Sequence, residues 1–312
     1  MHALRKLSSS FTRTLRRNVR RTLTSQPDAT TNAEKDKEKT IVVNQIGEVT
    51  AIGINRPEKQ NSLDVATAQL LSDTLDEFED NEKTSVAVLY GVGGNFCAGY
   101  DLSEIASYDG KNEESIPHFG QLANRNELPK KPLVACLSGY AVGIGFELAL
   151  MCDLRVMEDT AMIGFLNRRF GLPILCGGTV RLPAMVGYSR AMDLILTGRL
   201  VTAKETLNWG IANKITTCGA GLGVSVNLAK SLIKFPMKTL LADRASTHFA
   251  TFSAKQMDEA LQFEKDNASH LVFEEGVSGA KKFVEDGIGR HGKFYNIKAA
   301  DESIRELDET LL

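Results

Sequence analysis

The sequence has few of the features that mark membrane, metal-binding or nucleotide-binding proteins. No apolar run approaches the ~20 residues that a membrane-spanning helix requires, so we expect no membrane span. The five cysteines are far apart and no histidines alternate with them, so we predict that most of them are buried thiols and that they form no metal site. The glycine-rich segments at 91–102 and 139–150 contain neither a GxGxxG nor a GxxxxGK[ST] pattern, which argues against a dinucleotide loop and a P-loop there.

Acidic residues are absent from the first 27 positions, which hold seven of the chain's 37 lysines and arginines. Leucines and other apolar residues recur there every three or four positions, and a basic amphipathic helix of this kind is typical of a mitochondrial transit peptide. A basic arm or nucleic-acid tail is the alternative interpretation. Without this segment the chain has 30 basic against 39 acidic residues, so we expect no nucleic-acid partner. Residues 22–39 are polar and predict a linker.

Apolar periodicity in the rest of the chain predicts an α/β fold. We expect a β-hairpin over 41–54, a helix over 65–78, strands over 86–90, 132–137 and 161–164, and mostly helices from residue 178. Thr202 and Glu205 predict a capped helix start, and 255–272 and 276–286 predict amphipathic helices.

Two glycine-rich segments follow predicted strands, at 91–102 and 139–150. Glycine turns can direct main-chain N–H groups away from a strand ladder, and the first N–H groups of a helix attract negative charge. Together the two segments predict a two-donor oxyanion hole. Each segment alone is equally consistent with close packing of a strand against a helix.

Specific motifs lie within these segments. Residues 96–102, FCAGYDL, resemble the F-C/S-A/S-G-x-D-L/I signature of the crotonase (enoyl-CoA hydratase/isomerase) family, and 139–155, GYAVGIGFELALMCDLR, resemble its second glycine motif. Further blocks at 54–63, 177–182 and 196–212 follow in the family's order. The resemblance extends over roughly residues 41–290.

The resemblance implies a crotonase-type spiral of ββα units with a C-terminal helical region, assembled as a homotrimer or hexamer. We therefore expect a transit peptide and linker at 1–39, a core at 40–235, a helical region at 236–295 and a tail at 296–312. It implies an acyl-CoA substrate with CoA as part of the substrate and no other cofactor. The mitochondrial matrix is the expected location.

The resemblance also implies roles for individual residues. The thioester oxygen would accept hydrogen bonds from the N–H groups of Tyr100 and Ile144, although the family usually has glycine where Ile144 stands. Glu147 matches the family's first catalytic glutamate. The other residues that the resemblance places at the substrate are Ala98, Gly99, Asp101, Leu102, Gly143, Lys59 and Lys282, with the two lysines as candidates for the CoA phosphates.

An ungapped alignment to the family's pattern puts Asn167 where the resemblance implies a second catalytic glutamate, and an amide cannot exchange protons near neutral pH. Three interpretations remain open: a hydratase that uses Glu147 with Asn167 orienting water, an isomerase, or a site adapted to another acyl-CoA or to binding alone. Cys176 is either a weak nucleophile in the cleft or a buried inert thiol. The alternative roles of Arg168 and Arg169 are contact with a polar acyl terminus, binding of a CoA phosphate, or a subunit-contact or solvated position at the surface.

Overall fold

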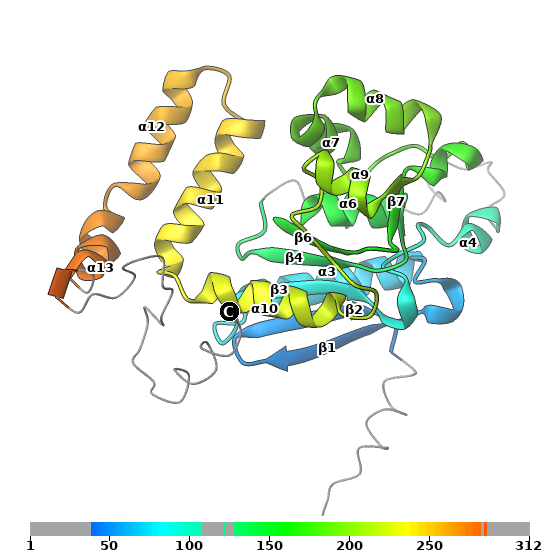
Figure 1. Cartoon of the computed structure of the whole chain (residues 1–312), viewed down its shortest axis with the longest axis horizontal. Coiled ribbons are helices and arrows are strands. Elements are labelled where there is room, and N and C mark those ends of the chain that lie inside the picture. The colour runs from blue at the N-terminus through cyan, green and yellow to red at the C-terminus, as the bar shows by residue number, and fades with distance from the viewer. Residues whose placement is uncertain (1–38, 108–121, 123–127, 282–283, 286–312) are drawn as a thin grey trace, which may run out of the picture. The chain divides into compact units, whose positions relative to one another are not determined.

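The computed structural model describes residues 39–107, 122, 128–281 and 284–285 (Figure 1). A compact unit begins at Thr40 and contains every element described below. Within the described ranges no helix is long and apolar enough to cross a membrane.

The larger of two sheets has six strands. Only the first strand pair is antiparallel, and the other neighbours are parallel. In spatial order the strands are β1 (Ile41–Ile46), β2 (Val49–Ile54), β3 (Val86–Gly91), β4 (Leu133–Leu137), β6 (Leu154–Glu158) and β9 (Lys214–Thr216). The predicted hairpin and the strands at 86–90 and 132–137 are therefore confirmed.

A smaller sheet lies at the end of the strands where the two glycine segments begin. It contains β5 (Tyr140–Val142), β7 (Met162–Gly164) and β8 (Val201–Thr202). A strand of the larger sheet is followed by a strand of the smaller sheet and then by a helix, in β4–β5–α6 and again in β6–β7–α7. With β1–β2–α3 this repeated ββα order confirms the expected spiral architecture.

Both faces of the larger sheet are covered, because side chains of one strand alternate between two apolar clusters. In β4, Leu133 and Ala135 face a cluster that includes residues of α3 and α6, while Val134 and Cys136 face a cluster with α10. The helices of this part are α3 (Val65–Asp80), α4 (Leu102–Ala106), α6 (Ile144–Met151), α7 (Gly178–Val186), α8 (Tyr188–Thr197), α9 (Ala203–Asn208) and α10 (Gly221–Ile233). Short 3-10 turns are η2 (Pro57–Lys59), η3 (Val92–Gly94) and η5 (Leu166–Phe170).

Local sequence signals explain where several helices begin. The Asp64 side chain accepts a bond from Thr67 N at 2.7 Å and caps α3. Thr202 likewise caps α9 through Glu205 N, as predicted. The strands β8 and β9 were not expected in a region whose pattern is mainly helical. They have two and three residues, too few for a period-two pattern to be visible.

The C-terminal helices form a hairpin beside the core (Figure 1). They are α11 (Met237–Phe252), α12 (Met257–Ala268), a π-helical turn η6 (Val272–Gly276) and α13 (Val277–Lys281). Arg244 of α11 donates to Asp153 after α6 at 2.6 Å, which joins the hairpin to the core.

Candidate active site

The two glycine segments lie side by side, although the 36 residues 103–138 separate them in the sequence. Cys97 N donates to Tyr140 O at 3.0 Å, and Val142 N donates to Cys97 O at 3.0 Å. This parallel bridge places the ends of both segments at the N-terminus of α6.

A glycine with positive φ precedes each of the two proposed donors. Gly99 has φ +107°, and Gly143 has φ +57° with ψ −126°, conformations that disfavour residues with a Cβ. Ile144 itself is not among the described non-glycine residues with positive φ. Its Cβ therefore meets no backbone strain, because Gly143 provides the unusual turn.

The main-chain groups of both segments have defined directions. The main chain of Leu63 accepts from Asp101 N and donates to Gly99 O, both at 2.8 Å. Because main-chain groups of successive residues in an extended segment point to alternate sides, the N–H of Tyr100 points away from Leu63. Ile144 is the first residue of α6, where an N–H has no intrahelical acceptor. Later in the same turn, Phe146 N and Glu147 N donate to Gly143 O at 3.0 and 3.2 Å.

Glu147 lies in the first turn of α6 and is 1% exposed. Its Oε1 accepts from Cys176 N at 2.6 Å and from Gly178 N at 3.0 Å. Its Oε2 is buried without a hydrogen-bond partner. Burial raises the pKa of this carboxyl above its usual value, while the N–H groups of Gly178 and Cys176 and the charge of Arg181 oppose the rise.

Asn167, in η5, is 8% exposed. Its Nδ2 donates to Leu172 O at 2.9 Å and to Pro173 O at 3.2 Å. Two carbonyl acceptors fix the orientation of the amide, because Oδ1 cannot donate to either of them. Oδ1 is buried without a partner and lies 4.0 Å from the position that a Cβ on Gly143 would occupy. Asn167 therefore presents a fixed acceptor beside the second glycine turn.

The side chain of Tyr100 joins this group, which the sequence motifs did not indicate. Its hydroxyl lies 3.6 Å from Cys176 Sγ, and both side chains are buried. Burial raises the pKa of Cys176 to about 11, so the neutral thiol prevails near neutral pH, in line with the second interpretation of this cysteine. The motif predicted a main-chain role at this position, which is independent of the side chain.

The remaining predicted residues have other contacts or are exposed. Asp101 caps α4 through Ser103 N and accepts from Arg56 at 3.1 Å, and these contacts lower its pKa against the effect of burial. Lys59 Nζ lies 3.8 Å from Asp101. Ala98 N donates to Gln60 O, Leu102 is 40% exposed, and both Arg168 and Arg169 are exposed. Lys282 lies outside the described residues.

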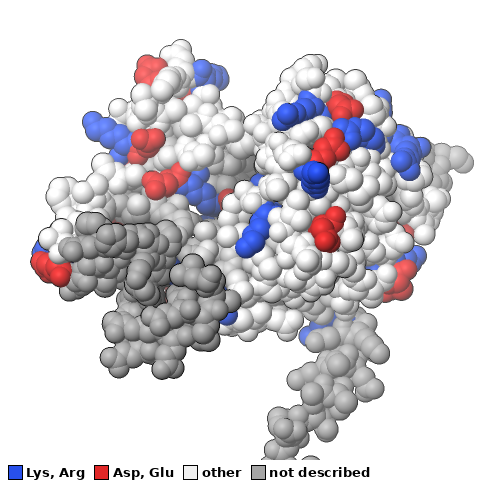
Figure 2. Space-filling view, viewed as in Figure 1, with Lys and Arg blue, Asp and Glu red and all other residues white. Residues whose placement is uncertain are grey.

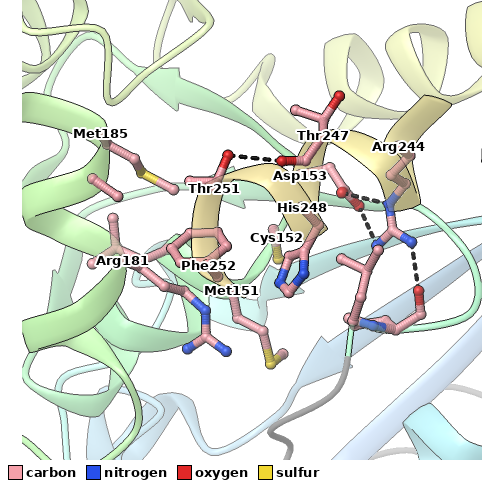
Figure 3. A pocket seen from close by; sticks show the side chains of 14 residues that line it. Met151, Cys152, Asp153, Arg181, Met185, Arg244, Thr247, His248, Thr251 and Phe252 are labelled. Atoms are coloured by element: carbon pink, nitrogen blue, oxygen red, sulfur yellow. Dashed lines mark hydrogen bonds and ion pairs between the residues drawn. The ribbon is translucent and has the colours of Figure 1, made fainter. Parts of the chain in front are cut away.

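A cavity of about 360 Å³ lies at the other end of α6, between α6, α7 and α11 (Figure 3). Met151, His248 and Phe252 line it, while Glu147, Asn167, Tyr100 and Ile144 do not. On the face shown in Figure 2, basic and acidic side chains are interspersed, and no broad field of one charge is visible. Among the described residues no group of three or more histidine, cysteine or acidic side chains is placed to hold a metal ion.

These positions define what the cluster can do chemically. Two main-chain N–H groups at adjacent glycine turns can stabilise a negative oxygen, and a buried carboxyl close by can exchange a proton. Asn167 can accept a hydrogen bond but cannot carry a proton.

Comparison with known proteins finds related sequences of one family. The sequence model of the family described as "Enoyl-CoA hydratase/isomerase" matches residues 44–291. A mevalonyl-coenzyme A hydratase of Aspergillus fumigatus is 27% identical over 242 residues, 76% of this chain and 88% of that protein. A Dictyostelium discoideum protein named "Probable enoyl-CoA hydratase, mitochondrial" is 27% identical over 249 residues, 78% of this chain and 82% of that protein.

Solved structures give the same result at the level of the fold. The crystal structure of an enoyl-CoA hydratase subunit from Geobacillus kaustophilus superposes with a TM-score of 0.74 at 32% identity and covers 82% of this chain and all of that chain. The family match includes both glycine segments, Glu147 and Asn167. The chain therefore belongs to the enoyl-CoA hydratase/isomerase family and has its crotonase fold.

Proposed function

We propose that the protein is an enoyl-CoA hydratase-like lyase that adds water to the double bond of an enoyl-CoA thioester. The N–H groups of Tyr100 and Ile144 stabilise the thioester enolate, Glu147 is the acid and base, and Asn167 orients water. CoA belongs to the substrate, and the proposed reaction needs no further cofactor. The names of two relatives, a mevalonyl-coenzyme A hydratase and a probable enoyl-CoA hydratase, support the reaction class.

One observation carries this proposal. Glu147 is held through Oε1 by two N–H groups, while Oε2 is buried without a partner at the helix start where both glycine segments meet. A buried unpaired carboxylate oxygen costs free energy, and a substrate or water that donates to it would remove that cost.

The proposed reaction balances with one proton carrier. Glu147 takes a proton from water as the water oxygen bonds to Cβ. The π pair of the Cα=Cβ bond then forms a Cα=C bond to the thioester carbon, and the carbonyl π pair moves to the thioester oxygen, which gives the enolate. Asn167 Oδ1 accepts the second O–H of the same water. Glu147 then returns the proton to Cα, so the product is a 3-hydroxyacyl thioester and the carboxylate is regenerated.

The test is to incubate the purified protein with enoyl-, 3-hydroxyacyl- and malonyl-type CoA thioesters and to identify products by mass spectrometry. We expect hydration of crotonyl-CoA or a longer enoyl-CoA, and a loss of kcat of about 10²–10⁴-fold in Glu147→Gln. Glu264→Gln, at an exposed position of α12, is the matched control. Unchanged turnover in Glu147→Gln would remove Glu147 from the mechanism.

A second candidate is a noncatalytic acyl-CoA-binding protein, and the amide at Asn167 favours it because the site has only one proton carrier. Tight binding of CoA thioesters without turnover across the panel would support this candidate. Movement of a double bond would instead indicate an isomerase, and loss of CO₂ from a malonyl-type thioester a decarboxylase.

We also propose that residues 1–39 are a transit peptide and linker that direct the protein to the mitochondrial matrix. The basic, acid-free segment 1–27 supports this, as does the relative whose name includes "mitochondrial". A fusion of residues 1–39 to a fluorescent protein should enter mitochondria. Fusions in which the seven basic residues are replaced by glutamine should not.

We further propose a core at 40–235, a helical region at 236–295, a tail at 296–312, and assembly as a homotrimer or hexamer. Large apolar side chains are exposed on the C-terminal helices, including Met257 at 77% and Phe273 at 82%. Surfaces of this kind are typical of subunit contacts. Light scattering coupled to size exclusion measures the assembly.

A further inference from the structure

Tyr100 belongs to both halves of the candidate site. Its main chain ends the first glycine segment, and its side chain extends to the loop that precedes α7. The hydroxyl lies 3.6 Å from Cys176 Sγ, within hydrogen-bond range for sulfur, and the tyrosine is 7% exposed. The ring is therefore a bridge between the proposed oxyanion segment and the loop that holds Glu147.

Cys176 is held at three points. Its N–H donates to Glu147 Oε1 at 2.6 Å, its carbonyl accepts from Arg181 Nη1 at 2.8 Å, and its thiol contacts Tyr100. Its neighbour Leu175 is 55% exposed, so this stretch of the loop has little apolar packing on that side. Cys176 also belongs to the buried apolar core, and Leu172 and Ile174 pack against that core. The position of Glu147 Oε1 thus depends on a loop that is held by both polar contacts and apolar packing.

We propose that the Tyr100 hydroxyl and the Cys176 thiol form a positioning pair that fixes the Glu147 carboxyl relative to the main-chain donor at residue 100. This inference rests on the proposed function, because it gives a role to the geometry between enolate donor and proton carrier. A continuous path links the two groups: Tyr100 main chain, ring and hydroxyl, then Cys176 thiol and N–H, then Glu147 Oε1.

The physical requirement for such a pair is precision. Catalytic groups act efficiently only when held within roughly 0.5 Å of the productive geometry, and a glutamate side chain has several rotatable bonds. The two N–H donors to Oε1, at Cys176 and Gly178, come from the same loop. A shift of that loop would therefore move Glu147, whereas the Tyr100 contact ties the loop to the donor segment.

The pair keeps its protons over the working range. Burial raises the pKa of Cys176 to about 11, and burial together with the neighbouring Cys176 raises that of Tyr100 further. The other groups that influence this pair are Glu147, Cys97 and Arg181. A neutral thiol and a neutral phenol can share a hydrogen bond beside a carboxylate, whereas a thiolate there would repel it.

The experiment is a double-mutant cycle on hydration. Tyr100→Phe keeps the ring and the main-chain N–H, and Cys176→Ala removes only the thiol. We expect each to lower kcat about tenfold with KM changed less than about twofold, since about 1.4 kcal/mol corresponds to a tenfold rate change. The double variant should be no slower than either single variant by more than about twofold, because one interaction is lost in all three.

A second readout separates positioning from a purely structural role. Loosening the N–H bonds to Oε1 removes stabilisation of the charged carboxylate, so the pKa of Glu147 should rise and the acid limb of the pH–rate profile should move to higher pH. Cys176→Ser, whose hydroxyl can replace the thiol, should recover most of the kcat lost in Cys176→Ala. Tyr188→Phe and Cys218→Ala, at exposed positions, are matched controls.

Failure of this inference and failure of the proposed function are distinguishable. If the wild-type protein hydrates no thioester, the proposed function is wrong, and the pair is then tested by infrared titration of the Glu147 carboxyl, assigned with Glu147→Gln. A higher carboxyl pKa in Tyr100→Phe and Cys176→Ala supports the pair. Unchanged kcat, an unmoved Glu147 pKa, or additive losses in the double variant would overturn it.

Discussion

The two ends of helix α6 differ in whether the buried polar groups beside them have hydrogen-bond partners. At the N-terminal end, Glu147 Oε2 and Asn167 Oδ1 are buried without hydrogen-bond partners. At the C-terminal end, Arg155 is 5% exposed and donates to the carbonyls of Ala149, Cys152, Asp153 and Ile211. The unpaired acceptors lie in the proposed active site, and the paired groups lie where the helix is joined to the core.

This difference indicates that the C-terminal end of α6 contributes to stability and the N-terminal end to activity. Arg155 places positive charge at the negative end of the helix dipole and satisfies carbonyls that the helix leaves open. At Glu147 one carboxyl oxygen, Oε2, has no hydrogen-bond partner, and burial raises the pKa of the carboxyl. We therefore expect substitutions at the C-terminal end to change stability, and those at the N-terminal end to change activity.

The largest effect is expected from Arg155→Met, which keeps an apolar stem and removes every donor. Several buried carbonyls lose their partner, so we expect unfolding to require about 3–4 kcal/mol less free energy. Denaturant titration measures this change. Arg168→Met, at an exposed position, should change stability by less than about 0.5 kcal/mol. A loss below 1 kcal/mol in Arg155→Met would contradict the comparison.

An intermediate effect is expected at Asn167. In Asn167→Asp the two bonds to Leu172 O and Pro173 O are lost and a carboxylate faces two carbonyls, so we expect kcat to fall about tenfold. Asn167→Glu should fail to increase hydration for the same reason. Steady-state rates with crotonyl-CoA measure both, with Asn208→Asp at an exposed position of α9 as control. Faster turnover in Asn167→Glu would show that the loop accepts a second acid.

The smallest effect is the pH dependence of stability at Glu147. Because its pKa in the folded state is raised, the folded protein binds more protons than the unfolded chain above the usual glutamate pKa, and stability falls as pH rises through that window. Glu147→Gln should therefore be more stable than wild type near pH 7, by about 2–4 °C in Tm, and the difference should shrink towards pH 4. Thermal scans across pH measure it, and a constant difference would argue against a raised pKa.

Much of the fold was predictable because its signals are local. The hairpin over 41–54, helix α3, strands β3, β4 and β7 and the cap at Thr202 follow from periodicity and capping residues. The strands β8 and β9 did not follow, because short strands are defined by their neighbours in the sheet. The C-terminal helices were predicted, but their boundaries shifted and a π-helical turn separates α12 from α13.

The motifs indicated Glu147, the two glycine segments and the amide at Asn167, but not how these groups are held. The orientation of the Asn167 amide depends on the carbonyls of Leu172 and Pro173, and the placement of Glu147 depends on N–H groups of Cys176 and Gly178. No sequence pattern predicted that Arg155 would donate to the carbonyls at the end of α6. Each of these contacts depends on turns and packing that a residue pattern does not describe.

The sequence by itself determined the family and the α/β architecture, and it predicted a site with Glu147 and the amide of Asn167, because these depend on residue types at fixed spacings. Only the tertiary structure decided that the positive φ falls on Gly143 and leaves Ile144 unstrained. It also decided that the Tyr100 side chain reaches Cys176. Such contacts arise between segments far apart in the chain, where the folded backbone alone sets the distances and directions.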